Sequence, residues 1–109
     1  MTGHFVEWSE PIVRVEDALR LVEAGYEWDT QAFLIGERLL PAEFFDLRTR
    51  FAGEFVQKLV NYQLRVAAVV APDVDRGARF AEFVLELRRH PAFRVFAERG
   101  EAEAWLSAG

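Results

Sequence analysis

Cysteine is absent from this chain of 109 residues, and its absence excludes disulfide bonds, thiolate catalysis and metal sites with cysteine ligands. The sequence also lacks an apolar run long enough to span a membrane, which takes about 18 residues. Its first residues, MTGHFVEWSEP, lack the basic start and the apolar core of a secretion signal. We therefore expect a cytoplasmic protein with no membrane partner.

Lysine is almost absent as well, because Lys58 is the only one in the chain. Acidic residues outnumber basic ones, and the formal net charge is −5 at pH 7. A nucleic-acid-binding protein needs a basic surface that neutralises phosphate groups. The charge balance therefore argues against a nucleic-acid partner.

Residues that could perform nucleophilic or metal-assisted chemistry are few and scattered. The serines are Ser9 and Ser107, and neither has a histidine placed to act as its base. His4 and His90 lie at opposite ends of the chain, each without a second ligand at helical spacing. A glycine-rich phosphate-binding loop is also missing. We therefore assign no catalytic residue, no metal site and no cofactor.

What the chain does contain is a long amphipathic segment followed by an apolar one, within residues 44–70. The first segment carries apolar residues at helical spacing, at Phe51, Ala52, Phe55, Val56, Leu59 and Val60. The second, RVAAVV at 65–70, has no polar residue after its arginine and is rich in β-branched side chains. This composition is typical of a central parallel strand that is buried on both faces. We expect Phe51, Phe55 and Leu59 to form the core contact of the helix.

Strand-like and helix-like segments alternate through the rest of the chain. We expect a β-hairpin from residues 4–8 and 12–15, strands within 31–36 and 93–97, and helices at 16–24, 78–89 and 101–107. Tyr26 and Trp28 are expected to pin the first helix to the sheet edge. The pattern predicts an α/β fold, with one domain over residues 1–109, a mostly parallel sheet and about four helices.

Two family resemblances follow from these residues. The order of elements, with the ending FRVFAERGEAEAWL, resembles the STAS domain of bacterial anti-sigma-factor antagonists and its SpoIIAA-like relatives. Most of the chain resembles a bacterial family of unknown function, DUF4180. The segment that most specifically matches that family is FFDLRTRFAGEFVQKLVNY; its matching residues are Phe44, Phe45, Asp46, Leu47, Thr49, Ala52, Gly53, Glu54, Gln57, Lys58, Asn61 and Tyr62. The DUF4180 resemblance implies no particular activity.

The candidate site is a polar row along the same segment. It comprises Asp46, Thr49, Arg50, Glu54, Gln57, Lys58 and Asn61. Its first members follow the strand at 31–36, and ligands of open α/β sheets sit beyond the carboxyl ends of strands. The last members lie roughly 12–18 Å from Thr49, at about 1.5 Å per helical residue. One small-molecule pocket cannot easily use the whole row, whereas a protein partner lying along the helix can.

Three functions are compatible with these observations. The first is a non-catalytic, STAS-like regulatory module that binds a protein partner, such as a regulator or a kinase, through the polar row. The second is a small-molecule binder, or a small cofactor-independent enzyme, that uses Asp46, Thr49, Arg50 and Glu54. The third is a homodimeric accessory protein without a site of its own.

Thr49 has two interpretations. In STAS-type antagonists a serine or threonine at a helix start is phosphorylated, and the resemblance implies the same role for Thr49. Its position beside Arg48 and Arg50 fits a phosphate, because helix N-termini and arginines bind anions. The alternative is an unmodified N-cap of the long helix, with Asp46 capping the preceding turn.

Overall fold

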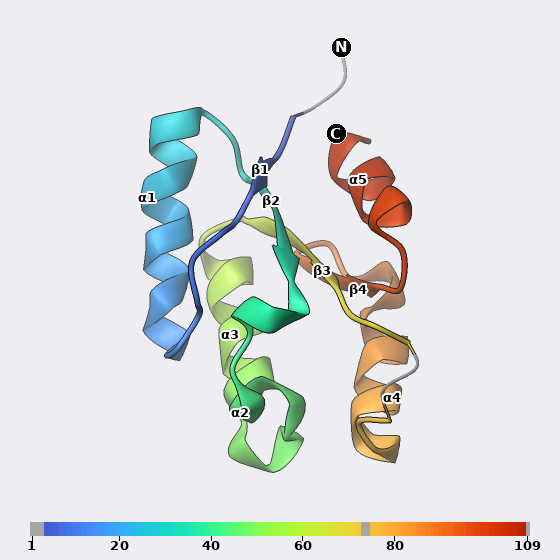
Figure 1. Cartoon of the computed structure of the whole chain (residues 1–109). Coiled ribbons are helices and arrows are strands. Elements are labelled where there is room, and N and C mark those ends of the chain that lie inside the picture. Colours follow the sequence, from blue (N-terminus) through green and yellow to red (C-terminus); the bar gives the residue numbers. More distant parts are fainter. Residues whose placement is uncertain (1–3, 73–74, 109) are drawn as a thin grey trace.

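The computed structural model describes residues 4–72 and 75–108 of the chain (Figure 1). In this part the strands are β1 (Val6–Glu7), β2 (Ala32–Gly36), β3 (Arg65–Val69) and β4 (Phe93–Phe96). The α-helices are α1 (Ala18–Trp28), α2 (Ala42–Phe45), α3 (Phe51–Asn61), α4 (Ala78–Glu86) and α5 (Arg99–Ser107). Short 3-10 turns are η1 (Val15–Asp17), η2 (Glu37–Leu39), η3 (Leu47–Thr49) and η4 (Leu87–Arg89). None of the described helices is long and apolar enough to cross a membrane.

The four described strands form one parallel sheet in the order β1-β2-β3-β4. The register pairs Ala32 with Arg65 and Val66 with Phe93. β3 is therefore an interior strand, and Val66, Ala67, Ala68 and Val70 are buried while Val69 is partly exposed. The predicted α/β fold with a parallel sheet is confirmed.

The expected N-terminal β-hairpin does not form. β1 pairs in parallel with β2, and residues 12–14 lie outside any strand. The Asp17 carboxylate accepts hydrogen bonds from the backbone N–H of Val13 (2.8 Å) and of Arg14 (3.0 Å). These bonds hold the segment in the turn that opens η1 and α1, so it cannot pair with β1.

The order of the strands determines how the helices are layered. Each new strand is added on the same side of the last, so crossovers of one hand place their helices on one face. Side chains of α1, α3 and α4 accordingly share one large core, whereas Ala102 and Leu106 of α5 pack with Leu34 and Ala67 on the opposite face. Figure 1 shows α1 and α3 side by side, with α5 across the sheet from them.

The apolar stripe of α3 provides much of the large core. Phe55 and Leu59 are fully buried, and Phe51 is 8% exposed. The Phe55 ring stacks on Phe51 with centroids 6.2 Å apart and meets Phe44 edge-on at 6.5 Å. The helix contact expected from the sequence is present in the structure.

Candidate functional site

The polar row divides into two groups that lie on different elements. Asp46 and Thr49 lie on the η3 turn, which precedes α3. Glu54, Gln57, Lys58 and Asn61 lie on the outer face of α3 and line a common hollow. Arg50 is the residue that joins the two groups.

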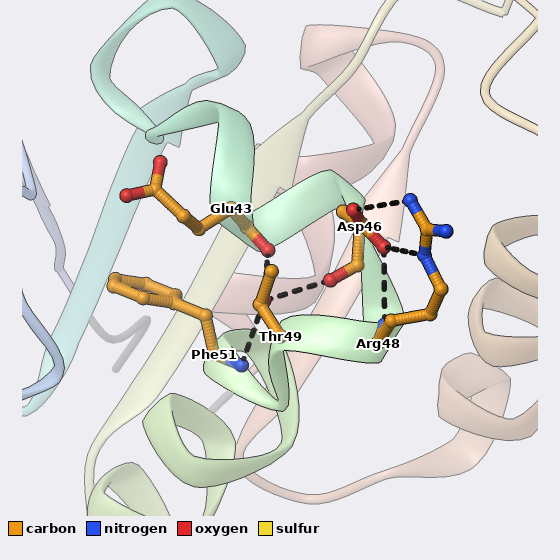
Figure 2. Close-up of polar contacts among 5 residues, drawn as sticks. All are labelled: Glu43, Asp46, Arg48, Thr49 and Phe51. Carbon is orange, nitrogen blue, oxygen red and sulfur yellow. Dashed lines mark hydrogen bonds and ion pairs between the residues drawn. The ribbon is translucent and has the colours of Figure 1, made fainter.

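Asp46 forms an ion pair with Arg48, two residues later in the chain (Figure 2). Its carboxylate accepts hydrogen bonds from the Arg48 guanidinium at 3.0 Å and from the Arg48 backbone N–H at 3.1 Å. The hydrogen bond from the Arg48 side chain, followed by that from its backbone, lowers the pKa of Asp46. The carboxylate therefore caps the turn, as expected, and at neutral pH it is not a proton donor.

Thr49 is also fully hydrogen-bonded (Figure 2). Its hydroxyl can donate to the carbonyl oxygen of Glu43 or of Asp46, each 2.7 Å away, and it accepts from the Phe51 N–H at 3.2 Å. The N-cap of α3 is Arg50, with φ 65° and ψ 4°, so the expected N-cap role of Thr49 is wrong by one residue. Thr49 instead stabilises the turn that leads into the helix.

The outer face of α3 is polar and largely exposed. Gly53, Glu54, Gln57 and Asn61 are exposed, and Lys58 is half-buried. Gln57 donates a side-chain hydrogen bond to Asn61 at 3.0 Å. The four polar side chains of α3 and the first two residues of η1, Val15 and Glu16, line a hollow of about 340 Å³. The hollow contains two carboxylates and one ammonium group.

A glycine inside a helix is ordinarily explained by close packing of the helix against a sheet. Gly53 does not have that role. It lies on the exposed face of α3, and a Cβ added there would meet nothing within 4 Å. The space above this residue is therefore open to an approaching partner.

A second hollow, of about 350 Å³, was not anticipated from the sequence. It is lined by Val22, Gly25, Tyr26, Asp29, Thr30, Gln31, Tyr62 and Leu64. The first hollow lies between α3 and the η1 turn before α1, and the second lies between α1 and the end of α3; the two hollows are here together called the α1–α3 groove. Tyr26 is 85% exposed and Trp28 is 58% exposed, so neither residue pins α1 to the sheet as expected.

The sequence did carry a signal for an exposed apolar face of α1. Leu19 and Tyr26 are seven residues apart and so share one helical face, whereas Ala18 and Leu21 mark the buried face. Leu19 is 46% exposed in the structure, and Val60 on α3 is 40% exposed. Apolar side chains are thus exposed on both helices that form the groove.

The polar groups that follow β2 and β3 are held by structural contacts. Arg76 pairs with Glu37, and its guanidinium lies 3.9 Å from the ring centroid of Phe45. Glu37 also accepts a hydrogen bond from the Ala71 N–H at 2.9 Å. The sequential strand order has no point at which it reverses, and such a point is where α/β sheets open a ligand crevice. Among the residues described, no group of three His, Asp or Glu side chains could hold a metal ion.

Comparison with known proteins places the sequence in a family. The family model described as "Domain of unknown function (DUF4180)" matches residues 4–106. The chain belongs to the DUF4180 family. No curated protein and no solved structure matches it. The DUF4180 match covers the helix face, the groove and the η3 turn, and its description names no activity for them.

Proposed function

We propose that this DUF4180 domain is a non-catalytic interaction module that binds a protein partner through the α1–α3 groove. The observation that carries the proposal is the pair of neighbouring hollows, one lined by the exposed polar face of α3 and the other by the exposed Tyr26 of α1. Protein interfaces often have aromatic hot-spot residues at their centre and a polar rim around them. Tyr26 and the polar side chains of α3 have this composition. A regulatory role of the STAS type is part of the same proposal.

The charges of the groove indicate what the partner presents. Glu16 and Glu54 contribute two carboxylates to the hollow beside α3, against the single ammonium group of Lys58. The whole chain carries a formal net charge of −5. We therefore expect a partner segment with a basic side chain toward Glu16 and Glu54, because complementary charges favour encounter and register.

The alternative function, a small-molecule or enzymatic site at Asp46, Thr49, Arg50 and Glu54, has less support. Asp46 is paired with Arg48, and the Thr49 hydroxyl is bonded to backbone groups of its own turn. Glu54 lines a different, open hollow whose described lining contains no aromatic residue. An interaction surface uses these residues as they stand, whereas a catalytic site would require them to be rearranged.

The proposal is tested with charge reversals on the groove. The purified chain serves as bait in an extract of its native host, in parallel with Glu54→Lys, Lys58→Glu and the control Glu101→Lys on the exposed side of α5. The partner recovered with the wild-type chain is then purified and titrated. We expect Glu54→Lys to bind it at least about tenfold more weakly, Lys58→Glu to bind it at least as tightly as the wild-type chain, and the control to bind normally. Equal binding by all four proteins would refute the proposed surface.

A further inference from the structure

The two edges of the sheet are protected to very different degrees. β1 is only two residues long, and its Glu7 pairs with Arg99 at 2.7 Å. β4 has four residues, FRVF, and its one charged side chain is directed toward α5, with the Arg94 guanidinium 4.7 Å from the ring centroid of Trp105. Natural sheets usually blunt an edge with short strands or charged side chains. β1 follows that rule and β4 does not.

β4 presents main-chain groups that are free to pair. Val66 and Val70 of β3 donate to the carbonyl groups of Ala92 (2.8 Å) and Phe96 (2.9 Å). Residues 92, 94 and 96 therefore face β3, and the alternation of a strand directs the N–H and C=O groups of 93, 95 and 97 outward. Within residues 4–72 and 75–108, no strand lies on that outer side. The N–H of Phe93 bonds His90 Nδ1 at 3.3 Å, which leaves the groups of Val95 at the centre of the open row.

An apolar hollow of about 630 Å³ lies between α4 and the carboxyl ends of β3 and β4. Its walls include Ala81, Val84 and Leu85 of α4, together with Val95 and Ala97. Leu85 is 60% exposed. A strand added to β4 would therefore gain both main-chain hydrogen bonds and apolar contacts, as in strand addition at other sheet edges.

We propose that β4 is a dimerisation edge, at which the β4 strand of a second copy pairs antiparallel to form one continuous eight-stranded sheet. A twofold axis beside Val95 places this residue opposite itself, and Phe93 opposite Ala97 of the partner. The interface is then isologous and closes at two copies. Because the edge strand is already ordered, pairing costs less conformational entropy than binding a flexible peptide.

The charges on α4 match the same arrangement. α4 flanks β4, so the twofold axis sets the two α4 helices antiparallel to each other. The first turn of α4 carries Arg79 and its last residue is Glu86, and both are exposed. The antiparallel arrangement brings Arg79 of one copy toward Glu86 of the other, with Ala81 and Leu85 between them. A second copy therefore fits the edge in hydrogen bonding, apolar contact and charge.

The test measures oligomeric state by sedimentation equilibrium from about 1 µM to 1 mM. The wild-type chain should reach twice its monomer mass of 12.5 kDa. Leu85→Glu places a charge in the interface without touching the core of the monomer, and should shift dissociation by at least about tenfold. Leu19→Glu, the same change at an exposed leucine of α1, should leave the dimer intact. A monomeric wild-type chain, or a dimer weakened equally by Leu19→Glu, would refute the proposal.

Hydrogen exchange distinguishes this interface from any other dimer. The amide of Val95 has no strand partner in the monomer and should exchange quickly in Leu85→Glu. In the wild-type dimer it should be protected, together with the amide of Ala97. A dimer in which the Val95 amide exchanges at the same rate as in Leu85→Glu would show that the chains associate elsewhere, and the β4 edge would be excluded.

Discussion

The η3 turn allows a sharp prediction about Thr49. A hydroxyl group can donate to only one of the carbonyl oxygens of Glu43 and Asp46 at a time, and it accepts from the Phe51 N–H. Thr49→Ala therefore loses one donated and one accepted hydrogen bond, each contributing about 0.5–1.5 kcal/mol net. We expect the free energy of unfolding to fall by about 1–3 kcal/mol, which overlaps the range of about 0.5–2 kcal/mol for lost helix caps.

Thr49→Asp tests whether the turn needs a hydrogen-bond donor at this position or only a polar side chain. A carboxylate can accept from the Phe51 N–H and is favoured near the start of α3. However, it has no proton to donate, and it would face two carbonyl oxygens that lie 2.7 Å from the native hydroxyl. We expect Thr49→Asp to lose as much stability as Thr49→Ala, while Thr49→Ser stays close to the wild type.

Urea unfolding followed by circular dichroism measures all three variants. If Thr49→Asp were as stable as the wild-type chain, the hydrogen bond that the Thr49 hydroxyl donates to these carbonyl oxygens would not stabilise the turn, which would refute the prediction. The result also bears on the proposed phosphorylation of Thr49. A phosphate on this oxygen removes the same donor, so modification must open the η3 turn before the phosphate can reach Arg48 or Arg50.

Three further predictions concern the core, the face of α3 and the turn before β4. Phe55→Ala should cost about 3–5 kcal/mol of stability, because the ring is fully buried, whereas Val60→Ala on the same helix should stay within about 0.5 kcal/mol of the wild type. Gly53→Ala should raise the unfolding free energy by about 0.5–1 kcal/mol, and a destabilised variant in the same urea assay would contradict the open space found above it. Burial, and then the charge of Arg94, lower the pKa of His90 below 6.5, so stability should be constant above that pH and should decline as the pH falls below it. His90→Asn, whose amide oxygen can still accept from the Ala92 N–H, should remove this decline, and an unchanged pH profile would refute the assignment.

The periodic parts of the fold could be predicted because their signal is local. The stripe from Phe51 to Leu59 and the apolar strand RVAAVV each identify their own element and buried face. The hairpin could not be judged in this way, since FVEW and IVRV both favour extended backbone. What decides between them is the hydrogen bond from the Trp8 N–H to the Leu34 carbonyl, which brings β1 alongside a strand far away in the sequence.

The polar outer face of α3 could be predicted from the sequence, whereas the hollows around it could not. Glu54, Gln57, Lys58 and Asn61 share one face by helical spacing alone. The groove beside them depends on the packing of α1 against α3, and no local pattern reports that contact. The sequence predicts the N-cap of α3 one residue too early. The reason is that Arg50 adopts a positive φ of 65°, which is uncommon for arginine and cannot be predicted from the residue type.

The two proposed surfaces lie at opposite ends of the strand order. The α1–α3 groove is formed by the helices that follow β1 and β2, whereas the dimer edge is β4 with α4 beside it. Pairing at β4 therefore leaves both grooves of the dimer open and facing away from the twofold axis. A partner that is itself dimeric could then engage both grooves, and the second contact would form at a high effective concentration. In that case Leu85→Glu would weaken partner binding without touching the groove, because it removes the second site and not the first.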